Sequence, residues 1–295
     1  MEYQSALDKI NEIMGTIEGK VGVAARLLDG KGEILINATD IYPTASTMKV
    51  PVLYELYRQV DEGKIDLNQR VEYNDTHPVC GSGILQDLGF GLSVTVRDLA
   101  VLMTVLSDNT ATDMLIDLVG IQNIQSTMRN LGLDQTTIAI TLREMMYSLA
   151  GYDINDTSIT FEKVRERLTK ARSEDKGRAT AEEDNDVSSP LDMIRLLTDI
   201  AESRTLSKES CADMIEILSR QKYNDIIPLY LPYGTTVAHK TGSIVTVRND
   251  VGIVYAPERP YTIAIMSKQL LDETDTLRKL ARISEVIYNY FTELT

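Results

Sequence analysis

Residues 235–268 read TTVAHKTGSIVTVRNDVGIVYAPERPYTIAIMSK, and this stretch decides the expected fold. Runs rich in β-branched and other apolar residues at 235–242, 247–256 and 261–268 predict three short strands, and the Pro-Glu-Arg-Pro turn joins the last two. Strands that follow one another through short turns pair antiparallel. The end of the chain is therefore expected to supply three strands of an antiparallel sheet.

The beginning of the chain is expected to add a hairpin and a helix. Residues 21–38 contain two apolar runs around a Gly-Lys-Gly turn, which is the pattern of a β-hairpin. The segment 4–17 has apolar residues at helical spacing, and so does the last segment of the chain. One helix at each end is therefore expected to flank the sheet. The apolar stripe of the last helix consists of Leu277, Leu280, Ile283, Ile287, Phe291 and Leu294.

The interior of the chain is mostly helical in pattern, from Ser46 to about Leu218. A sheet built from both ends of the chain, with a helical block between them, predicts an α+β fold in which one domain interrupts another. We expect a discontinuous sheet domain at 1–45 and 219–295 and an all-helical domain at 46–218.

A charged insertion is expected within the helical block, at about 150–186. Fifteen of the twenty-five residues at 162–186 are charged, with the two signs nearly balanced. A short helix can begin after Thr160, which is a good capping residue. Two interpretations stay open: a solvated surface insertion or a mobile lid over a site. The thin apolar stripe of the short helix consists of Phe161, Val164 and Leu168.

The composition excludes several classes of function. With 30 basic and 44 acidic side chains in 295 residues, the formal net charge is −14, which argues against nucleic acid or an anionic membrane as the main partner. No run of about 18 apolar residues occurs, so no membrane span is expected. The opening residues, MEYQSALDKI, lack the basic and apolar regions of a signal peptide. We expect a monomer that is cytoplasmic as written, or secreted or periplasmic if a leader was removed.

Cysteine and histidine are scarce. Two of each cannot build a zinc ribbon, a haem site or a disulfide scaffold, and no metal or other cofactor is expected. Cys80 and Cys211 are expected to be free thiols. His239 precedes Lys240 on a predicted strand, so the two side chains point to opposite faces and His239 is expected to be a hydrogen-bonded structural residue.

The first candidate for chemistry is Ser46-Thr47-Met48-Lys49, where a helix is expected to begin. Residues three apart share one helix face, so the Lys49 amine can approach the Ser46 hydroxyl. A buried lysine with a lowered pKa can take the proton of a serine and make it nucleophilic. The pattern alone is weak, because Ser173 and Lys176 match it inside the charged insertion.

Two further motifs strengthen the first. Ser107-Asp108-Asn109 follows a helical run, and Lys240-Thr241-Gly242-Ser243 lies in a predicted strand near the end of the chain. The three motifs in this order are a signature of class A β-lactamases and penicillin-binding proteins. The surrounding stretches YPTASTMKVP, GSGIL, SDNTATDMLI and RNDVGIVY agree with it. The chain therefore resembles the class A β-lactamase family of serine hydrolases.

The resemblance covers nearly the whole chain except the charged insertion. It implies a β-lactamase-like fold with a five-stranded antiparallel sheet, flanking terminal helices and an inserted helical domain, with the site between sheet and helices. It also implies that Ser46 is the acylated nucleophile, Lys49 its proton partner, and Ser107 the hydroxyl that passes a proton to the departing nitrogen.

The remaining motif residues would bind the substrate. The resemblance implies that Asn109 donates to an amide of the substrate side chain, and that Lys240 and Thr241 hold the substrate carboxylate. Arg248 falls where many members keep an arginine for the same carboxylate, although a surface ion pair is an equally good interpretation. The backbone N–H groups of Ser46 and Ser243 would form the oxyanion hole, in which each donor contributes roughly 2.7–4 kcal/mol to lowering the barrier.

The family pattern breaks where efficient members carry a glutamate that activates water. The corresponding stretch here reads LDQTTIAITLREMMYSLAG, and an ungapped count places Leu142 or Arg143 at the position of the glutamate. Glu144 reaches that position only through a small gap, so it is either a water-activating base or a structural carboxylate. Without such a base, the chain would be acylated quickly and released slowly.

Three functions stay open on these grounds. The first is a serine hydrolase that forms an acyl-enzyme and hydrolyses a β-lactam or related cyclic amide. The second is a carboxylesterase or D-alanyl peptidase with poor β-lactam turnover. The third is a penicillin-binding pseudoenzyme that is acylated without turnover. In each case the expected partner is a small-molecule β-lactam, ester or peptide.

Overall fold

The computed structural model describes residues 1–170 and 180–294. Within these residues, five strands form one antiparallel sheet in the order β2-β1-β9-β8-β7, and the expected fold class is confirmed. Both ends of the chain contribute to this sheet, and β7 lies at its edge. The strands are β1 (Lys20–Leu27), β2 (Glu33–Ile36), β7 (Thr236–Ile244), β8 (Val247–Tyr255) and β9 (Tyr261–Lys268).

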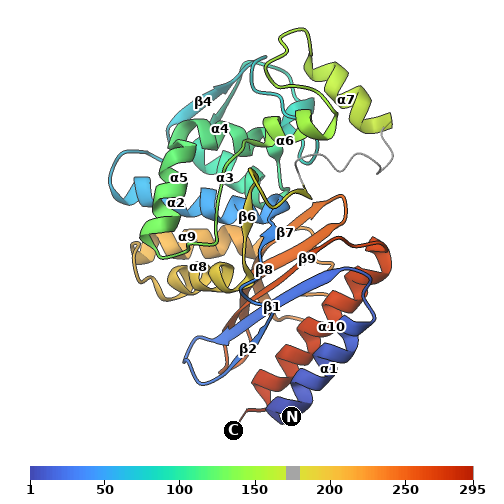
Figure 1. Ribbon diagram of the computed structural model, residues 1–295. Helices are drawn as coiled ribbons and strands as arrows, with labels where there is room; N and C mark the ends of the chain where they lie inside the picture. The colour runs from blue at the N-terminus through green and yellow to red at the C-terminus, as the bar shows by residue number, and fades with distance from the viewer. Residues whose placement is uncertain (171–179, 295) are drawn as a thin grey trace.

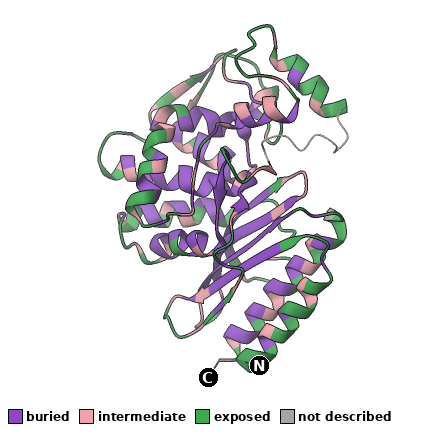
Figure 2. Ribbon diagram, in the orientation of Figure 1, coloured by how far each residue is buried: buried purple, intermediate pink, exposed green. Residues whose placement is uncertain are grey.

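The two terminal helices lie side by side on one face of the sheet (Figure 1). They are α1 (Tyr3–Gly15) and α10 (Glu273–Thr292), and they pack against each other. The apolar stripe predicted for the last helix supplies Leu280, Ile283 and Ile287, all fully buried, to a core shared with this face of the sheet. The outward faces of both helices are exposed (Figure 2).

The helical block covers the opposite face of the sheet. Helix α8 packs on β1 and β9, and α9 packs against β7. The helices of this block are α2 (Lys49–Asp61), α3 (Val96–Val105), α4 (Asn109–Val119), α5 (Ile121–Asn130), α6 (Leu142–Leu149), α7 (Phe161–Lys170), α8 (Pro190–Glu202) and α9 (Lys208–Ser219), with 3₁₀ turns η1 (Ala45–Met48) and η2 (Leu85–Asp87).

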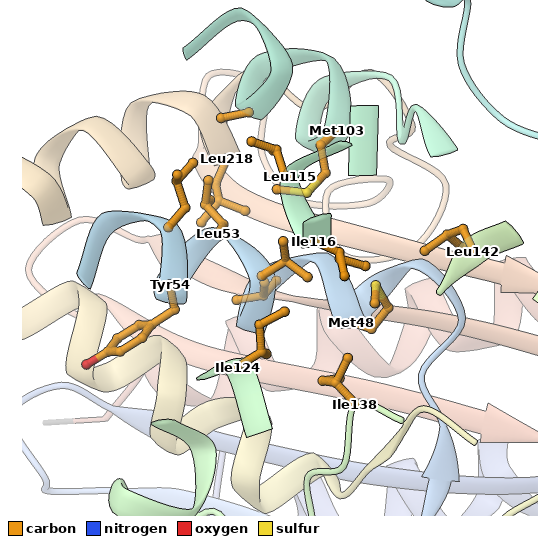
Figure 3. Close-up of a cluster of buried hydrophobic side chains, with 14 of the residues drawn as sticks. Met48, Leu53, Tyr54, Met103, Leu115, Ile116, Ile124, Ile138, Leu142 and Leu218 are labelled. Atoms are coloured by element: carbon orange, nitrogen blue, oxygen red, sulfur yellow. The ribbon is translucent and has the colours of Figure 1, made fainter. Parts of the chain in front are cut away.

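Helix α2 runs through the centre of this block. Nearly all of its residues are buried, and Val52, Leu53 and Leu56 of α2 are fully buried. Figure 3 shows Leu53 among side chains of the surrounding helices, including Leu115 and Leu218. Because α2 continues directly from η1, the core fixes the position of the residues that precede it.

Pro51 fits this helix without loss of a hydrogen bond. Helix α2 begins at Lys49, so Pro51 lies in its first turn. The N–H groups of a first turn have no acceptor inside the helix, and a residue that lacks an N–H is tolerated there.

Two short strand pairs escape prediction because their strands are too short to show a period. They pair β3 (Tyr42–Pro43) with β6 (Val187–Ser188), and β4 (Arg70–Tyr73) with β5 (Leu92–Thr95). The β3–β6 pair ties the approach to Ser46 to the chain that follows the charged insertion. Buried residues of the helical block and of the sheet belong to one continuous cluster, so the division into two domains stays a prediction.

Helix α7 confirms the short helix predicted in the charged insertion. It follows Thr160, whose hydroxyl accepts a hydrogen bond from the Lys163 N–H at 3.4 Å. Val164 is buried, and the helix packs against α6 (Figure 1). The mobile-lid interpretation and the second match at Ser173 and Lys176 involve residues 171–179, which lie outside the described residues. Among the described residues, no helix combines the length and the hydropathy that crossing a membrane requires.

Candidate active site

Ser46 is the partly exposed residue of an otherwise buried turn. Its neighbours Ala45, Thr47 and Met48 in η1 are buried. Ala45 has a φ of +46°, a left-handed conformation that costs free energy for a residue with a Cβ. The side-chain amide of Asn249 on β8 donates to the carbonyl of Thr44 at 3.1 Å and holds this turn against the sheet.

Lys49 follows Ser46 by three residues and is almost fully buried. Its ammonium group donates to the carbonyl oxygen of Ser107 at 2.8 Å, to Ser107 Oγ at 3.1 Å and to Asn109 Oδ1 at 2.9 Å. These three acceptors account for all three N–H donors of a charged lysine. A neutral Lys49 keeps two donors and gains a lone pair, which is what a base for Ser46 requires.

Ser107 brings two lysines together. Its hydroxyl oxygen accepts from Lys49 at 3.1 Å and from Lys240 at 3.2 Å. These two bonds occupy both lone pairs of the oxygen, so the hydroxyl proton is directed to a third partner. Ser107 lies in the loop between α3 and α4 and has a φ of +55°, a left-handed conformation that is uncommon for a residue with a Cβ.

The electrostatic environment favours neutral amines. Burial, followed by the positive charge of Lys240, lowers the pKa of Lys49 well below its usual value, although Asp108 and Asp113 act in the opposite direction. Burial also lowers the pKa of Lys240 to about 7, although Asp250 opposes the shift. Two buried lysine amines that share one hydroxyl are not easily protonated at the same time, because their positive charges would repel each other.

Asp108 organises the loop that faces these lysines. It caps α4 by accepting from the Ala111 N–H at 2.9 Å. Its second carboxylate oxygen accepts from the N–H groups of Ile84 at 2.7 Å and Leu85 at 2.8 Å. A Cβ on Gly83 would lie 2.2 Å from the Asp108 carboxyl carbon, which explains the glycine of the GSGIL stretch. Ser82 is therefore held beside the Ser107 motif.

Gly242 allows β7 to approach the turn that carries Ser46. A Cβ at this position would lie 2.6 Å from the carbonyl oxygen of Thr44 and 3.0 Å from the N–H nitrogen of Thr47. Because β7 is an edge strand, part of its backbone is free of strand partners. The N–H of Ser46, second residue of η1, has no acceptor inside that turn. Ser46 and Ser243 are thus brought to one place.

Ser46 lies at the junction of two cavities. Ser46, Ser82 and Ser243 line both. The first cavity, of about 190 Å³, has a mixed polar and apolar lining and also includes Ser107 and Thr241. It extends to a loop, missed by the sequence analysis, that carries Tyr223, Asp225 and Ile226.

The second cavity, of about 260 Å³, is bounded by side chains that we call the apolar wall. The sequence analysis missed this wall because its residues come from three distant segments, each of which shows only an ordinary helical or strand pattern. The apolar wall consists of Leu142, Met145, Met146, Leu149, Leu168 and Ile244.

Glu144 does not line either of these cavities. Its carboxylate accepts from the Thr141 N–H at 2.7 Å and from the Thr141 hydroxyl at 3.2 Å, and the Thr141 hydroxyl in turn accepts from the Glu144 N–H. This reciprocal capping box opens α6 and turns the carboxylate towards a separate cavity with His77 and Asp113. This position fits the structural-carboxylate interpretation of Glu144 and not the interpretation as a water-activating base. Leu142, Met145, Met146 and Leu149 of the same stretch line the cavity with Ser46 instead.

Two residues that were predicted to bind the substrate, Asn109 and Arg248, form hydrogen bonds with other residues of the protein. The Asn109 side chain donates to the carbonyl of Cys80 at 2.8 Å and accepts from Lys49, although it also borders the apolar cavity. The guanidinium of Arg248 donates to the carbonyl oxygens of Ile244 at 2.8 Å and Val247 at 2.6 Å, across the turn between β7 and β8. Arg248 is not among the described residues that line the two cavities.

His239 has the structural role expected of it. Its ring nitrogens lie 2.8 Å from Asp250 Oδ1 and 3.1 Å from Asn224 Oδ1. Cys80 and Cys211 are free thiols, as predicted. No group of three or more potential metal ligands gathers among residues 1–170 and 180–294.

Comparison with known proteins gives one consistent family. The sequence matches the family model "Beta-lactamase enzyme family" over residues 6–291. It is 25% identical over 302 residues to the extended-spectrum beta-lactamase PER-1 of Pseudomonas aeruginosa, with 96% of this chain and 86% of that protein covered. A solved beta-lactamase from Sphaerobacter thermophilus superposes with a TM-score of 0.82 at 25% identity and full coverage of both chains.

A penicillin-binding relative matches equally well. The structure of PBP-A has a TM-score of 0.82 and 25% identity, and the match covers 99% of this chain and 97% of PBP-A. A mutant of PBP-A has been solved as an acyl-enzyme complex with penicillin-G.

Proposed function

Since this chain belongs to the beta-lactamase enzyme family and is a serine hydrolase resembling class A β-lactamases, we propose that β-lactams or related cyclic amides acylate Ser46 and that the acyl group is released slowly. The observation that carries this proposal is the convergence of Lys49 and Lys240 on the Ser107 hydroxyl beside the Ser46 cavities.

In the acylation step, neutral Lys49 takes the proton of Ser46 while the serine oxygen attacks the substrate carbonyl. Burial and the charge of Lys240 support this role, because both favour the neutral amine. The new negative charge on the carbonyl oxygen would be met by the N–H groups of Ser46 and Ser243.

In the second half of acylation, the amide bond breaks and its nitrogen needs a proton. Ser107 is placed to deliver it, because its hydroxyl oxygen accepts two ammonium hydrogen bonds and its own proton is directed elsewhere. The departing nitrogen and its carboxylate would lie in the first cavity, which Ser107 and Thr241 border. Lys240 supplies positive charge behind that cavity wall.

Slow release follows from the surroundings of the acylated serine. Hydrolysis of the ester needs a water molecule held and activated by a base. The apolar wall offers such a water no hydrogen-bond partner, and Glu144 is engaged in its capping box. Acylation is therefore supported by several polar groups of the site, and deacylation has to rely on Lys49.

The test is a pre-steady-state reaction with a chromogenic cephalosporin. We expect a burst close to one equivalent of product followed by a slow steady phase, and no burst for Ser46→Ala. Sustained rapid turnover would show an efficient β-lactamase and contradict slow release. No reaction, together with cleavage of short p-nitrophenyl esters, would indicate the carboxylesterase instead.

A further inference from the structure

A groove of about 450 Å³ lies between the two terminal helices, α1 and α10, which are side by side in Figure 1. The ammonium group of Lys279, near the start of α10, donates to the carbonyl oxygen of Thr16, just past the end of α1, at 2.8 Å, so the two helices run antiparallel. The groove shares no lining residue with either cavity at Ser46. We call it the terminal groove, and its lining includes Lys9 and Ile13 of α1 and Arg278, Arg282 and Val286 of α10.

The bed of the terminal groove is mostly apolar, although most of the residues that line it are charged. Ile13 and Val286 are partly exposed there, one from each helix. Long basic side chains cover apolar surface with their methylene stems and keep their charged ends in water. A molecule in the terminal groove would therefore meet hydrocarbon along the bed and charge at the rim.

The charge at the rim is mainly positive. Four basic side chains line the terminal groove, namely Lys9, Arg278, Lys279 and Arg282, and two carboxylates oppose them, those of Glu12 and Glu285. The Glu285 carboxylate is already paired with Arg282 at 2.6 Å. Because the whole chain has a net charge of −14, this local excess of positive charge sets the terminal groove apart and favours an anion.

Two of the four cations are available to such an anion. Among the side chains that the structure describes, Lys9 and Arg278 form no ion pair, and the Lys9 ammonium group donates only to the sulfur of Met1, at 3.6 Å. Lys279, in contrast, is paired with Asp275 at 2.6 Å. Arg278 is the stronger candidate of the two, because a guanidinium can hold a carboxylate through two parallel hydrogen bonds.

We propose that the terminal groove binds a fatty-acid anion, with the carboxylate at Arg278 and the hydrocarbon chain along Ile13 and Val286. The volume of about 450 Å³ lies in the range of roughly 300–1,000 Å³ that is typical of small-molecule sites. The inference goes beyond the proposed function and does not depend on it, because it needs neither Ser46 nor any residue of the two cavities there.

The test is isothermal titration calorimetry with dodecanoate, kept below its critical micelle concentration. We expect one dodecanoate to bind per chain. Each methylene that enters the groove tightens binding by up to about fourfold, so dodecanoate should bind at least about tenfold more tightly than octanoate.

Dodecyltrimethylammonium tests the sign of the charge, because it has the same hydrocarbon chain with a cationic head group. Unspecific attraction to a chain of net charge −14 would favour this cation over dodecanoate. The terminal groove should reverse that order and bind dodecyltrimethylammonium at least about tenfold more weakly than dodecanoate, because its head group would meet Arg278.

Two variants locate the binding. Arg278→Ala removes the partner of the carboxylate, and Val286→Asp places a charge in the apolar bed, so each should weaken dodecanoate binding at least about tenfold. Arg129→Ala is the matched control, because Arg129 is an exposed arginine of α5, in the helical block on the other face of the sheet. It should keep the wild-type affinity.

Three results would overturn the inference. The first is the absence of saturable dodecanoate binding to the wild type. The second is dodecyltrimethylammonium binding as tightly as dodecanoate. The third is wild-type affinity for dodecanoate in either Arg278→Ala or Val286→Asp, with circular dichroism showing the variant folded, because dodecanoate would then bind elsewhere. None of these results bears on acylation of Ser46.

Discussion

At the scale of single residues, the site depends on the charge states of two buried lysines. Lys49 has to be neutral to accept the Ser46 proton, and burial, which lowers its pKa well below the usual value, favours the neutral amine. Lys240 has to be charged to attract a carboxylate, and with a pKa of about 7 its amine is largely protonated only below neutral pH. One ammonium group thus assists the reaction by losing its proton and the other by keeping it.

A difference in pH dependence between two substrates follows. Above about pH 7, Lys240 loses its charge, so kcat/KM for acylation by a penicillin, which carries a carboxylate, should fall by up to about tenfold per pH unit. An uncharged ester should not show this descending limb. Lys240→Arg, which keeps its charge, should move the limb to higher pH. Stopped-flow measurement of acylation from pH 5 to 9 gives the pH profiles of the wild type with penicillin and with the ester, and of Lys240→Arg with penicillin. Identical wild-type profiles for penicillin and ester would contradict the role of Lys240.

A carboxylate in the apolar wall should accelerate release. Leu142 is 2% exposed and borders the cavity with Ser46. It is the first residue of α6, where a negative charge is favourable. Leu142→Glu is expected to raise the rate of deacylation at least about tenfold by activating water, whereas the isosteric Leu142→Gln should not. Mass spectrometry of the decaying adduct gives the rates, and equal decay in both variants would refute an apolar barrier to hydrolysis.

Glu144→Gln should leave the same decay rate unchanged. The Glu144 carboxylate is bound to Thr141 at the start of α6 and lines another cavity. The Thr-x-x-Glu pattern at 141–144 is itself a capping-box signature. Local sequence therefore contained the evidence for a structural carboxylate. An adduct that persists longer in Glu144→Gln would restore it as the base.

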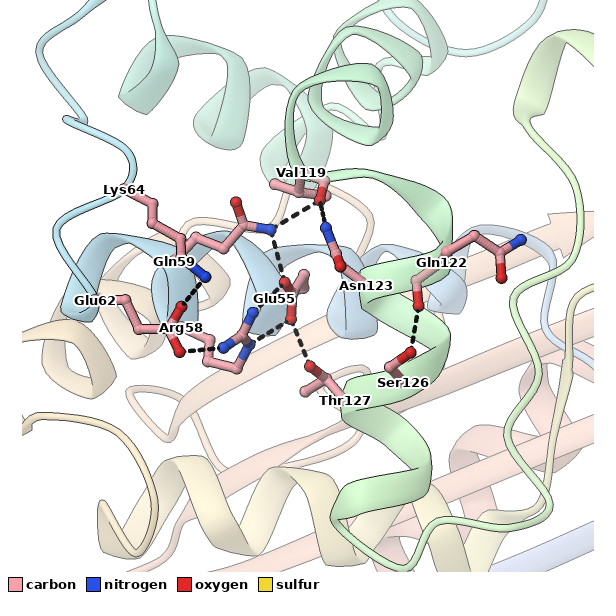
Figure 4. A network of polar contacts seen from close by, with 10 residues as sticks. All are labelled: Glu55, Arg58, Gln59, Glu62, Lys64, Val119, Gln122, Asn123, Ser126 and Thr127. Carbon is pink, nitrogen blue, oxygen red and sulfur yellow. Dashed lines mark hydrogen bonds and ion pairs between the residues drawn. The ribbon is translucent and has the colours of Figure 1, made fainter.

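At the scale of elements, α2 transmits the packing of the helical block to Ser46. Glu55 of α2 is fully buried and accepts from Arg58 at 2.7 Å, Gln59 at 2.7 Å and Thr127 of α5 at 2.6 Å. Figure 4 shows these side chains converging on the Glu55 carboxylate. Although burial alone would raise it, hydrogen bonds from Arg58, Thr127 and Gln59 lower the pKa of Glu55. The network fixes α2 against α5.

Removal of this carboxylate should reduce stability in a pH-dependent way. Glu55→Gln is expected to lower the free energy of unfolding by about 1–3 kcal/mol at pH 7, because buried donors lose a charged acceptor. A carboxylate with a lowered pKa stabilises fully above its unfolded pKa of about 4.3, and the contribution fades as pH falls through the folded value. Urea unfolding should show the difference narrowing below about pH 4. Glu62→Gln removes an exposed carboxylate just after this helix, and it should lower the free energy of unfolding at pH 7 by less than Glu55→Gln does.

The contact between η1 and β7 can be tested without altering a reactive group. Gly242→Ala would push the strand from Thr44, because the added Cβ would lie 2.6 Å from its carbonyl oxygen. We expect acylation to slow by about 10²–10³, as for loss of one oxyanion donor, with the thermal midpoint lowered only modestly. Gly15→Ala, whose Cβ would meet no atom within 4 Å, is the control. Unchanged acylation in a folded Gly242→Ala protein would argue against an oxyanion hole at this contact.

At the scale of the whole molecule, the sheet was predictable because its strands have regular patterns and short turns. The meeting of Ser46, Ser107 and Lys240 was predictable only through the family resemblance, since no local pattern relates residues so far apart. The surroundings of the site were not predictable. Leu168 shows only the stripe of a surface helix, and its place at the cavity depends on how α7 packs on α6.

The most direct test of the account is a time course of intact-protein mass spectrometry after mixing with penicillin-G. The account predicts that the wild-type chain gains the mass of one penicillin within seconds, that Ser46 carries it, and that the adduct persists for many minutes, with no adduct on Ser46→Ala. A wild-type chain that destroys penicillin without accumulating an adduct, or an adduct that survives in Ser46→Ala, would contradict it.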